Sequence, residues 1–175
     1  MNENDRPFAA DTFRYGYRPT VTGLAAIAVG GRGVAAVLLG NERGELLRKL
    51  RDALPGAVLV EDEVIIGPVL DAVARHIDAP TGEPEFDLDL RGDAGERAVW
   101  AALRAIPVGE TRSYGAIAKA IDIGMTAQAV GAACAANRLA VVVPCHRVLK
   151  ADGSISGYRW GVGRKRQLLS LEGAA

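Results

Sequence analysis

The sequence predicts an α/β N-terminal half followed by a mainly helical C-terminal half that contains a helix-turn-helix. Three short strand-like runs separated by glycine-containing turns open the chain, at residues 12–17, 23–29 and 34–39. Two short helical segments joined by a Gly-containing turn lie in the second half. Prolines and a glycine at residues 79–84 indicate a linker, so we place the boundary between the halves near residue 90.

The spacing of apolar residues predicts the remaining elements of the first half. Leucines at helical intervals predict a helix over residues 42–54, which a Pro-Gly pair ends. A short strand is expected at residues 58–60. A second helix is expected over residues 62–77, with Ile65 and Ile66 among its inward-facing side chains.

The ends of this half are less regular. Residues 86–90 alternate apolar side chains with aspartates, which is typical of an edge strand or an extended connection. The polar residues 1–11 predict a flexible tail. The sequence therefore predicts an N-terminal domain over residues 12–90.

The C-terminal domain, residues 91–175, is predicted to contain four helices. The first covers residues 94–106 and the last covers residues 165–171. Between them, Ser113 is a plausible N-cap for a helix at residues 114–121, and Thr126 for a helix at residues 127–136.

The predicted helix at residues 127–136 contains almost no long side chain except Gln128. A helix that reads bases in the major groove usually presents several long polar side chains. Small side chains instead allow the backbone of a helix to approach a neighbour closely. Two interpretations stay open, a helix buried in the core and a helix that enters a nucleic-acid groove through backbone and phosphate contacts.

The composition restricts the class of protein. The 175 residues are 49% apolar and 24% charged, which is enough for a folded core. Two cysteines and two histidines are too few for a disulfide framework or an evident metal site, so we expect no metal and no cofactor. Free thiols and the absence of a signal segment or a long apolar span favour a cytoplasmic location.

Charge is divided unevenly between the halves, although the net charge is zero. Residues 1–90 carry nine Lys/Arg and fifteen Asp/Glu, a net −6, whereas residues 91–175 carry twelve Lys/Arg and six Asp/Glu, a net +6. A basic half is suited to a polyanion such as nucleic acid. The alternative interpretation is that the surfaces of the two halves have unrelated charges, which would give the same counts of charged residues.

The stretch Pro144-Cys145-His146-Arg147-Val148 is the strongest chemical signal in the chain. It follows the apolar run at residues 140–143, which resembles a buried strand. Basic neighbours lower the pKa of a thiol, so the stretch suggests an activated nucleophile at the end of a strand. A structural cysteine in a turn is the alternative interpretation.

Several motifs together resemble one family. The cysteine stretch, preceded by Asn137 and by Thr111-Arg112-Ser113-Tyr114-Gly115, resembles the O6-alkylguanine-DNA alkyltransferases. The segments 135–137 and 157–161 are most similar to the methyltransferase half of bacterial adaptive-response (Ada-type) proteins. The resemblance covers about residues 12–172.

The resemblance implies a ribonuclease-H-like α/β N-terminal domain and a mainly helical, winged-helix-like C-terminal domain with a helix-turn-helix. In that family the second helix of the pair enters the minor groove of double-stranded DNA and the damaged nucleotide is flipped out. The partner would therefore be duplex DNA containing O6-alkylguanine, and O4-methylthymine is an expected second substrate. The resemblance also implies a monomer that acts away from membranes.

The resemblance assigns catalytic roles residue by residue. Cys145 would be the nucleophile that takes the alkyl group, with His146 as general base through a water molecule and Glu172 orienting His146. Tyr114 would donate a proton to the departing guanine, and Asn137 would be the hinge asparagine that bonds backbone near the site. The alkylated cysteine is a stable thioether, so each chain would act once.

Further residues would hold DNA or the domain itself. The carbonyls of Cys145 and Val148 would hold the exocyclic amine of the base, and Tyr158 would pack on it from a lid at residues 156–161. The other DNA-binding candidates are Arg112, Ser113, Ala127, Gln128 and Arg159. Pro144 and Arg147 would be structural, with Arg147 tying the domains together.

Gln128 departs from the family pattern. Most members place an arginine there, which fills the space left by the flipped base. Glutamine is shorter and uncharged, so we expect flipping to be less favourable while the thiol chemistry is intact. Arg112 and Arg138 are alternative sources of the missing contact.

Two other functions stay open from the sequence. The first is a module that binds alkylated bases with weak or no transfer, which the presence of Cys145 disfavours. The second is an unrelated thiol hydrolase with a Cys-His-Glu triad, which the helix-turn-helix and the basic half disfavour. The zinc domain of complete adaptive-response proteins has no counterpart in these residues, which predicts a stand-alone repair protein or a separate regulatory partner chain.

Overall fold

The computed structural model describes residues 11–174, which form a mixed α/β protein of two compact units. The first unit contains residues 11–91 and Arg138–Val142, and the second contains Gly92–Asn137 and residues 143–174. The short segment Arg138–Val142 thus belongs to the first unit, although the boundary predicted near residue 90 assigns it to the second half. The predicted tail lies outside the described residues, apart from Asp11. Within residues 11–174, no helix is both long and apolar enough to cross a membrane.

A four-stranded sheet organises the first unit. Its strands in chain order are β1 (Thr12–Thr20), β2 (Gly23–Gly30), β3 (Gly33–Gly40) and β4 (Val58–Glu61). The order across the sheet is β3-β2-β1-β4, with β4 parallel to β1 and the other pairs antiparallel. Gly23 and Gly33 follow the two hairpin turns at φ of 115° and 120°, a conformation that only glycine adopts without strain. The predicted strands are confirmed.

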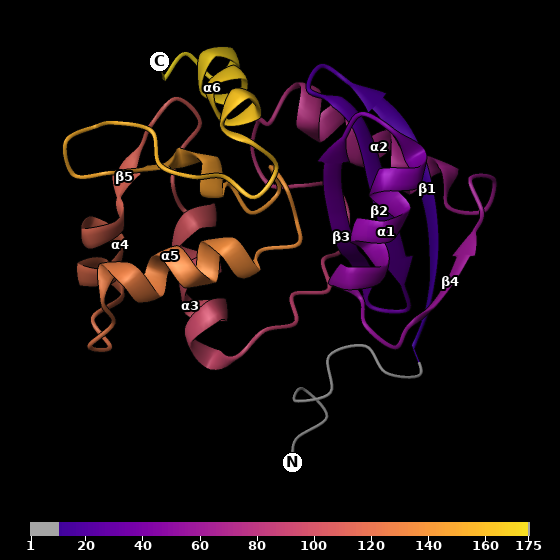
Figure 1. The fold of residues 1–175 in the computed structure, drawn as a ribbon, viewed down its shortest axis with the longest axis horizontal. Coiled ribbons are helices and arrows are strands. Elements are labelled where there is room, and N and C mark those ends of the chain that lie inside the picture. Colours follow the sequence, from indigo (N-terminus) through magenta and orange to yellow (C-terminus); the bar gives the residue numbers. More distant parts are fainter. Residues whose placement is uncertain (1–10, 175) are drawn as a thin grey trace. The chain divides into compact units, whose positions relative to one another are not determined.

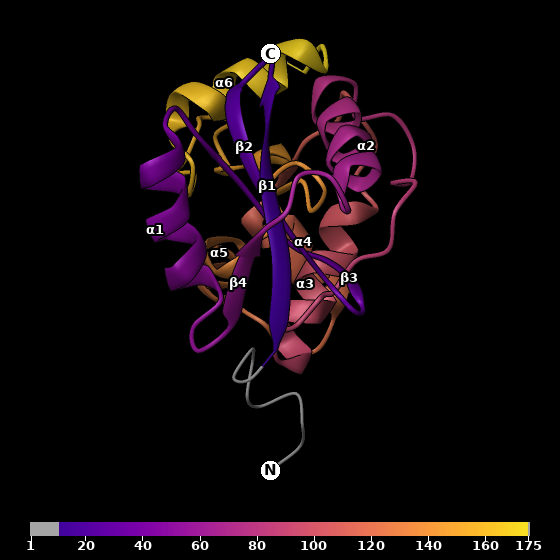
Figure 2. The same ribbon diagram turned by 90° about the vertical axis from the view of Figure 1, so that its right-hand side faces the viewer.

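Two helices cover opposite faces of this sheet, α1 (Arg43–Ala53) and α2 (Gly67–Asp78), as Figure 2 shows. Gly16 pairs with Ile27 and would meet Leu70 of α2 if it had a Cβ, whereas Gly40 pairs with Leu24 and would meet Leu46 of α1. Leu24 and Ile27 lie three residues apart on β2, so they and the glycines paired with them point to opposite faces of the sheet. The glycines therefore allow each helix to pack closely against its own face.

Two elements of the first unit differ from the prediction. The predicted helix at residues 62–77 begins only at Gly67, and Ile65, expected to face inward, is 65% exposed. The side chain of Asp62 accepts a bond from the Ile65 amide and so stabilises a turn there. Of the two alternatives predicted for residues 86–90, the edge strand is wrong and the connection is observed, with one isolated bridge between Leu88 and Val34.

The second unit is mainly helical (Figure 1). Its helices are α3 (Ala94–Arg104), α4 (Tyr114–Ile121), α5 (Ala127–Ala136), the 3-10 turn η2 (Cys145–Arg147) and α6 (Val162–Leu171). The two-residue strands β5 (Arg112–Ser113) and β6 (Val148–Leu149) pair in parallel. Helices α3, α4 and α5 pack against one another, and the buried Trp100 of α3 donates a hydrogen bond to the carbonyl of Ala133 in α5.

Side-chain caps begin three of these helices. Asp93 and Glu96 form a reciprocal capping box at α3. The hydroxyl of Ser113 accepts from the amide of Ala116, and that of Thr126 from the amide of Ala129. The predicted caps of α4 and α5 are confirmed.

The apolar run at residues 140–143 is buried, but it is not a strand. Its residues form a turn in which Val141 has a φ of 67°, a left-handed conformation that is costly for a β-branched side chain. Burial therefore explains the apolar sequence, because Val141 and Val143 are each at most 1% exposed.

Candidate active site

The turn η2 presents Cys145 to the interior of the second unit. The pairing of β5 with β6 places Val148 beside Arg112, so the cysteine turn is tied to the start of α4. The side-chain amide of Asn137, at the end of α5, donates to the carbonyl of Val143 at 2.9 Å and to the sulfur of Cys145 at 3.4 Å. Cys145 is only 4% exposed. Asn137 thus fixes both the backbone before the thiol and the thiol itself.

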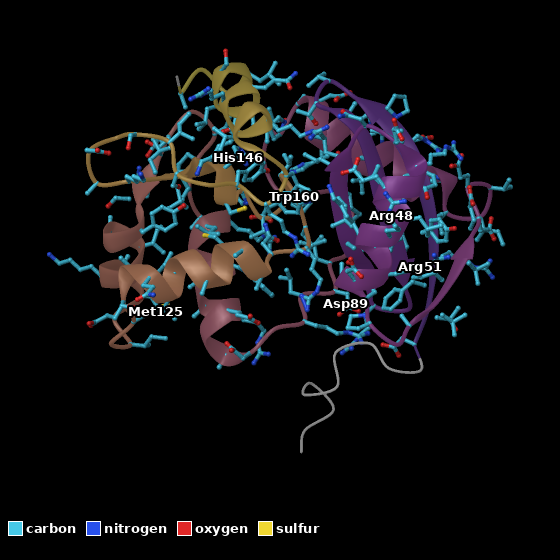
Figure 3. The ribbon with its side chains drawn as sticks, in the orientation of Figure 1. Arg48, Arg51, Asp89, Met125, His146 and Trp160 are labelled. Atoms are coloured by element: carbon cyan, nitrogen blue, oxygen red, sulfur yellow. The ribbon has the colours of Figure 1, made fainter. Side chains whose placement is uncertain are left out.

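His146, labelled in Figure 3, belongs to η2 and forms a buried pair with Glu172. The Nε2 of His146 lies 2.8 Å from Oε1 of Glu172. Arg147 donates to both carboxylate oxygens of Glu172, at 2.9 and 2.8 Å, and to the carbonyl of Ile106 at 2.7 Å. The side chain of Glu172 is 1% exposed. These bonds of Arg147 lie within the second unit, so they hold Glu172 against η2 and do not tie the two units together as the resemblance implied.

The charge states follow from burial and from these bonds. Burial opposes ionisation of Glu172, but its bonds to His146 and Arg147 prevail and lower its pKa to about 2. Burial lowers the pKa of His146, opposed by the bond to Glu172. Burial also raises the pKa of the Cys145 thiol above its ordinary value, although Asn137 and the charge of Lys165 act in the opposite direction. The sequence suggested a thiol pKa lowered by basic neighbours, and that expectation is wrong, so the thiol needs a base.

His146 is a candidate for that base. Its Nε2 faces a carboxylate, so the hydrogen of the neutral ring belongs on Nε2 and Nδ1 is left as an acceptor. Nδ1 is buried and has no hydrogen-bond partner among the residues that the structure describes. The arrangement therefore leaves an unpaired basic nitrogen on the residue that follows Cys145.

A cavity of about 390 Å³ opens beside the thiol. It is lined by Tyr114, Gly131, Cys134, Ala135, Cys145, Gly157, Tyr158 and Arg159. Helix α5 contributes only small side chains to this wall, which explains its unusual composition. One side of α5 is buried at Val130 and Cys134, and the residues at its start are exposed. The buried side agrees with a helix packed in the core, whereas entry of this helix into a nucleic-acid groove stays a prediction.

Tyr158 and Arg159 come from the segment before α6. The Tyr158 ring packs edge-on against His146 and against Trp160, with centroids 6.5 and 5.2 Å apart. Its hydroxyl is buried without a hydrogen-bond partner in the described part of the chain. Arg159 donates to the carbonyls of Asn137 at 2.8 Å and Ala135 at 3.3 Å, which binds this segment to the C-terminal end of α5.

Three residues of the site were missed from the sequence or given no role. Lys165 is fully buried, and its Nζ donates to the carbonyl of Val148 at 2.6 Å and to the hydroxyl of Ser156 at 3.2 Å. The Ser156 hydroxyl lies 2.5 Å from that of Tyr114. Cys134 lines the cavity, and burial raises the pKa of its thiol to about 12. The carbonyl of Val148, expected to hold the base, thus already accepts one hydrogen bond.

The expected DNA-binding residues lie at the starts of α4 and α5. Gln128 is exposed in the first turn of α5, as is Ala127. Arg112 is exposed and pairs with Glu110 at 2.7 Å. Arg138, considered as a replacement for the missing arginine, instead donates to the carbonyls of Ala53 and Arg91 in the first unit.

The site chemistry is that of a thiol, a neutral imidazole and a carboxylate beside a cavity that a planar ring could enter. No group of three or more His, Cys, Asp or Glu side chains within residues 11–174 is arranged to hold a metal ion. The arrangement can generate a thiolate, but it does not by itself identify the electrophile.

Comparison with known proteins shows the family to which the chain belongs. Residues 94–174 match the family model described as the DNA-binding domain of 6-O-methylguanine DNA methyltransferase. The inducible methylated-DNA–protein-cysteine methyltransferase of Bacillus subtilis is 38% identical over 128 residues, which cover 73% of this chain and 72% of that protein. The chain belongs to the methylated-DNA–protein-cysteine methyltransferase family. The chain is also similar to a solved structure of Mycobacterium tuberculosis OGT in complex with DNA, with a TM-score of 0.71 and 34% identity. The match covers 93% of this chain and 92% of that one.

The chain is also similar to a larger protein. The bifunctional transcriptional activator/DNA repair enzyme Ada of Escherichia coli is 40% identical over 159 residues, which are 91% of this chain but 45% of that protein. The chain thus spans about half the length of this relative.

Proposed function

We propose that this protein repairs DNA by transferring the alkyl group of O6-alkylguanine irreversibly to Cys145. The observation that carries the proposal is the placement of a buried cysteine against a cavity, next to a His146–Glu172 pair whose free ring nitrogen can take the thiol proton. Family membership supplies the substrate class, and the DNA-bound OGT structure supports duplex DNA as the partner.

The proposed reaction has three steps, in which protons and electron pairs balance. The thiol proton of Cys145 passes through a water molecule to His146, which Glu172 orients and stabilises when charged. The thiolate attacks the alkyl carbon, so a C–S bond forms and the C–O bond breaks with its electron pair left on the base. Tyr114 then gives its hydroxyl proton to the departing guanine. No route returns the thioether to a thiol, so each molecule acts once.

We propose that the base reaches the cavity by flipping out of a duplex bound through its minor groove. The small residues of α5 support this mode, because a helix with almost no long side chains can approach a groove closely. Arg112, Ser113, Ala127 and Gln128 would contact DNA, and Tyr158 and Arg159 would border the flipped base. O4-methylthymine is a second expected substrate, and we expect a monomer to act.

The finer description of the fold is also a proposal. The sheet order β3-β2-β1-β4 with α1 and α2 supports a ribonuclease-H-like N-terminal domain at residues 12–90. The adjacent capped helices α4 and α5 support a winged-helix-like unit with a helix-turn-helix at residues 91–175.

A binding module without transfer is the alternative function, and the exposed Gln128 is the observation that favours it. Single-turnover assays with duplex DNA that carries one radiolabelled O6-methylguanine separate the two. Repair predicts that label moves to protein up to one equivalent and that Cys145→Ser abolishes the movement. Tight binding of the damaged duplex without movement of label would contradict the proposal.

A further inference from the structure

Lys165 is an unusual residue, since a lysine side chain is seldom fully buried without a charged partner. The two hydrogen-bond acceptors of its Nζ are neutral oxygens, the carbonyl of Val148 and the hydroxyl of Ser156. Retaining such a group is costly, which suggests that it serves the site beside it. The roles proposed above leave it without a function.

The hydrogen bonds around Lys165 have a fixed direction when the lysine is charged. An ammonium group only donates, so the Ser156 oxygen must accept from it. The single hydrogen of Ser156 is then free for the Tyr114 oxygen, 2.5 Å away. Tyr114 consequently accepts at its oxygen, and its own hydrogen is left to point into the cavity that it lines.

We propose that Lys165 and Ser156 are positioning residues that orient the Tyr114 hydroxyl as a proton donor toward the departing base. This inference rests on the proposed function, because it concerns the protonation of the leaving group in that reaction. Neither residue needs to touch the base, since both act through the hydrogen-bonded row Lys165–Ser156–Tyr114.

The same row completes the proton balance of the transfer. When the C–O bond breaks, the Tyr114 proton goes to the base, the Ser156 hydrogen moves to Tyr114, and a Lys165 proton moves to Ser156. Lys165 is left as a neutral amine, which regains a proton from solvent after the base departs.

The charges in the site favour donation of the Tyr114 proton to the base once the Cys145 thiolate has formed. Burial lowers the pKa of Lys165, whereas a thiolate at Cys145 raises it. Formation of the nucleophile therefore favours the charged lysine, which is the state that leaves the Tyr114 hydrogen available. Burial raises the pKa of Tyr114 above its ordinary value, and the bond with Ser156 acts against that rise.

The test compares two methyl donors with different leaving groups. Transfer from O6-methylguanine duplex DNA requires a proton on the base, whereas methyl iodide releases iodide without one. Ser156→Ala should slow single-turnover transfer from DNA by about tenfold and change methylation of Cys145 by methyl iodide less than about twofold. Ser156→Thr, which keeps the hydroxyl, should restore transfer from DNA. Lys165→Met should slow transfer from DNA more than it slows methylation by methyl iodide, which it also slows because the Lys165 charge favours the thiolate.

Ser154→Ala provides the matched control, because Ser154 lies in the same segment and its side chain bonds to the exposed Asp152. Equal slowing with both donors would indicate a packing role and overturn the inference, as would a Ser156→Ala variant with the wild-type rate from DNA. If the wild-type protein takes methyl from methyl iodide but never from DNA, the proposed function itself fails. For each methyl donor and each variant, residue-level mass spectrometry distinguishes methylation of Cys145 from methylation of Cys134.

Discussion

The Nε2 of His146 lies 2.8 Å from Oε1 of Glu172, and both side chains are at most 1% exposed. This contact determines which ring nitrogen carries the hydrogen and leaves Nδ1 as the basic atom. Arg147 holds the same carboxylate from the other side, so the three side chains form one unit. We therefore expect the chemistry of Cys145 to depend on Glu172.

Glu172→Gln should reduce both transfer and stability. Breaking a buried pair by removing one partner costs about 3 kcal/mol, because His146 and Arg147 are left without their carboxylate. The pKa of Glu172 is about 2 in the folded protein against an ordinary 4.5, so its contribution is present above pH 4.5 and is lost as the pH falls toward 2. Urea unfolding at several pH values should show the wild-type advantage shrinking over that interval.

Glu110→Gln is the control for this experiment. Glu110 forms an exposed ion pair with Arg112, which should contribute less than about 1 kcal/mol. A wild-type advantage over Glu172→Gln that is as large near pH 2 as at neutral pH would contradict the assignment of a depressed pKa.

Cys145 should react slowly with iodoacetamide at neutral pH. Burial raises its pKa, so the thiolate fraction is small and should still be rising at about pH 9. Asn137→Ala removes a hydrogen bond to the sulfur and should slow the reaction further. Stopped-flow alkylation of a Cys134→Ser protein measures Cys145 alone, and a rate that levels off below about pH 8 would oppose this account.

Gln128→Arg should accelerate transfer from duplex DNA. A longer, charged side chain can compensate for the stacking and pairing that the duplex gives up when the base flips out, and about 1.4 kcal/mol of compensation gives a tenfold faster rate. Gln167→Arg adds the same charge at an exposed position of α6 and should leave the rate unchanged. Single-turnover rates that are equal for Gln128→Arg and wild type would disprove the role of Gln128.

Tyr158 should act through its ring. The ring packs on His146 and Trp160, but its buried hydroxyl has no hydrogen-bond partner in residues 11–174. Tyr158→Phe should therefore keep transfer within about twofold and leave the melting temperature unchanged or higher, because an unpaired buried hydroxyl is costly. Tyr158→Ala should slow transfer at least about tenfold through loss of stacking on the base. A large defect in Tyr158→Phe would instead assign the hydroxyl a direct role.

Local signals predicted much of the second unit. Ser113 and Thr126 cap α4 and α5 because a hydroxyl before an apolar helical segment satisfies amides that lack partners. The side chains of His146 and Glu172 lie in contact, as the family resemblance implied, although 26 residues separate them. Resemblance was needed there, because sequence spacing does not encode a contact of that range.

Tertiary effects explain what the sequence did not indicate. Residues 140–143 have the composition of a strand, but the positive φ of Val141 makes them a turn whose apolar side chains are simply buried. The prediction of a lowered pKa for the Cys145 thiol was wrong, because desolvation raises this pKa more than the neighbouring groups lower it. Lys165 carried a usable signal, since it lies three and four residues before the buried Leu168 and Leu169 on one helical face.

The most direct test of the account is residue-resolved mass spectrometry after incubation with duplex DNA containing O6-methylguanine. We predict one added methylene per chain, located on Cys145, with none in Cys145→Ser and an unchanged yield in Cys134→Ser. An unmodified protein, or a methyl group on Cys134, would contradict the claim that Cys145 is the acceptor.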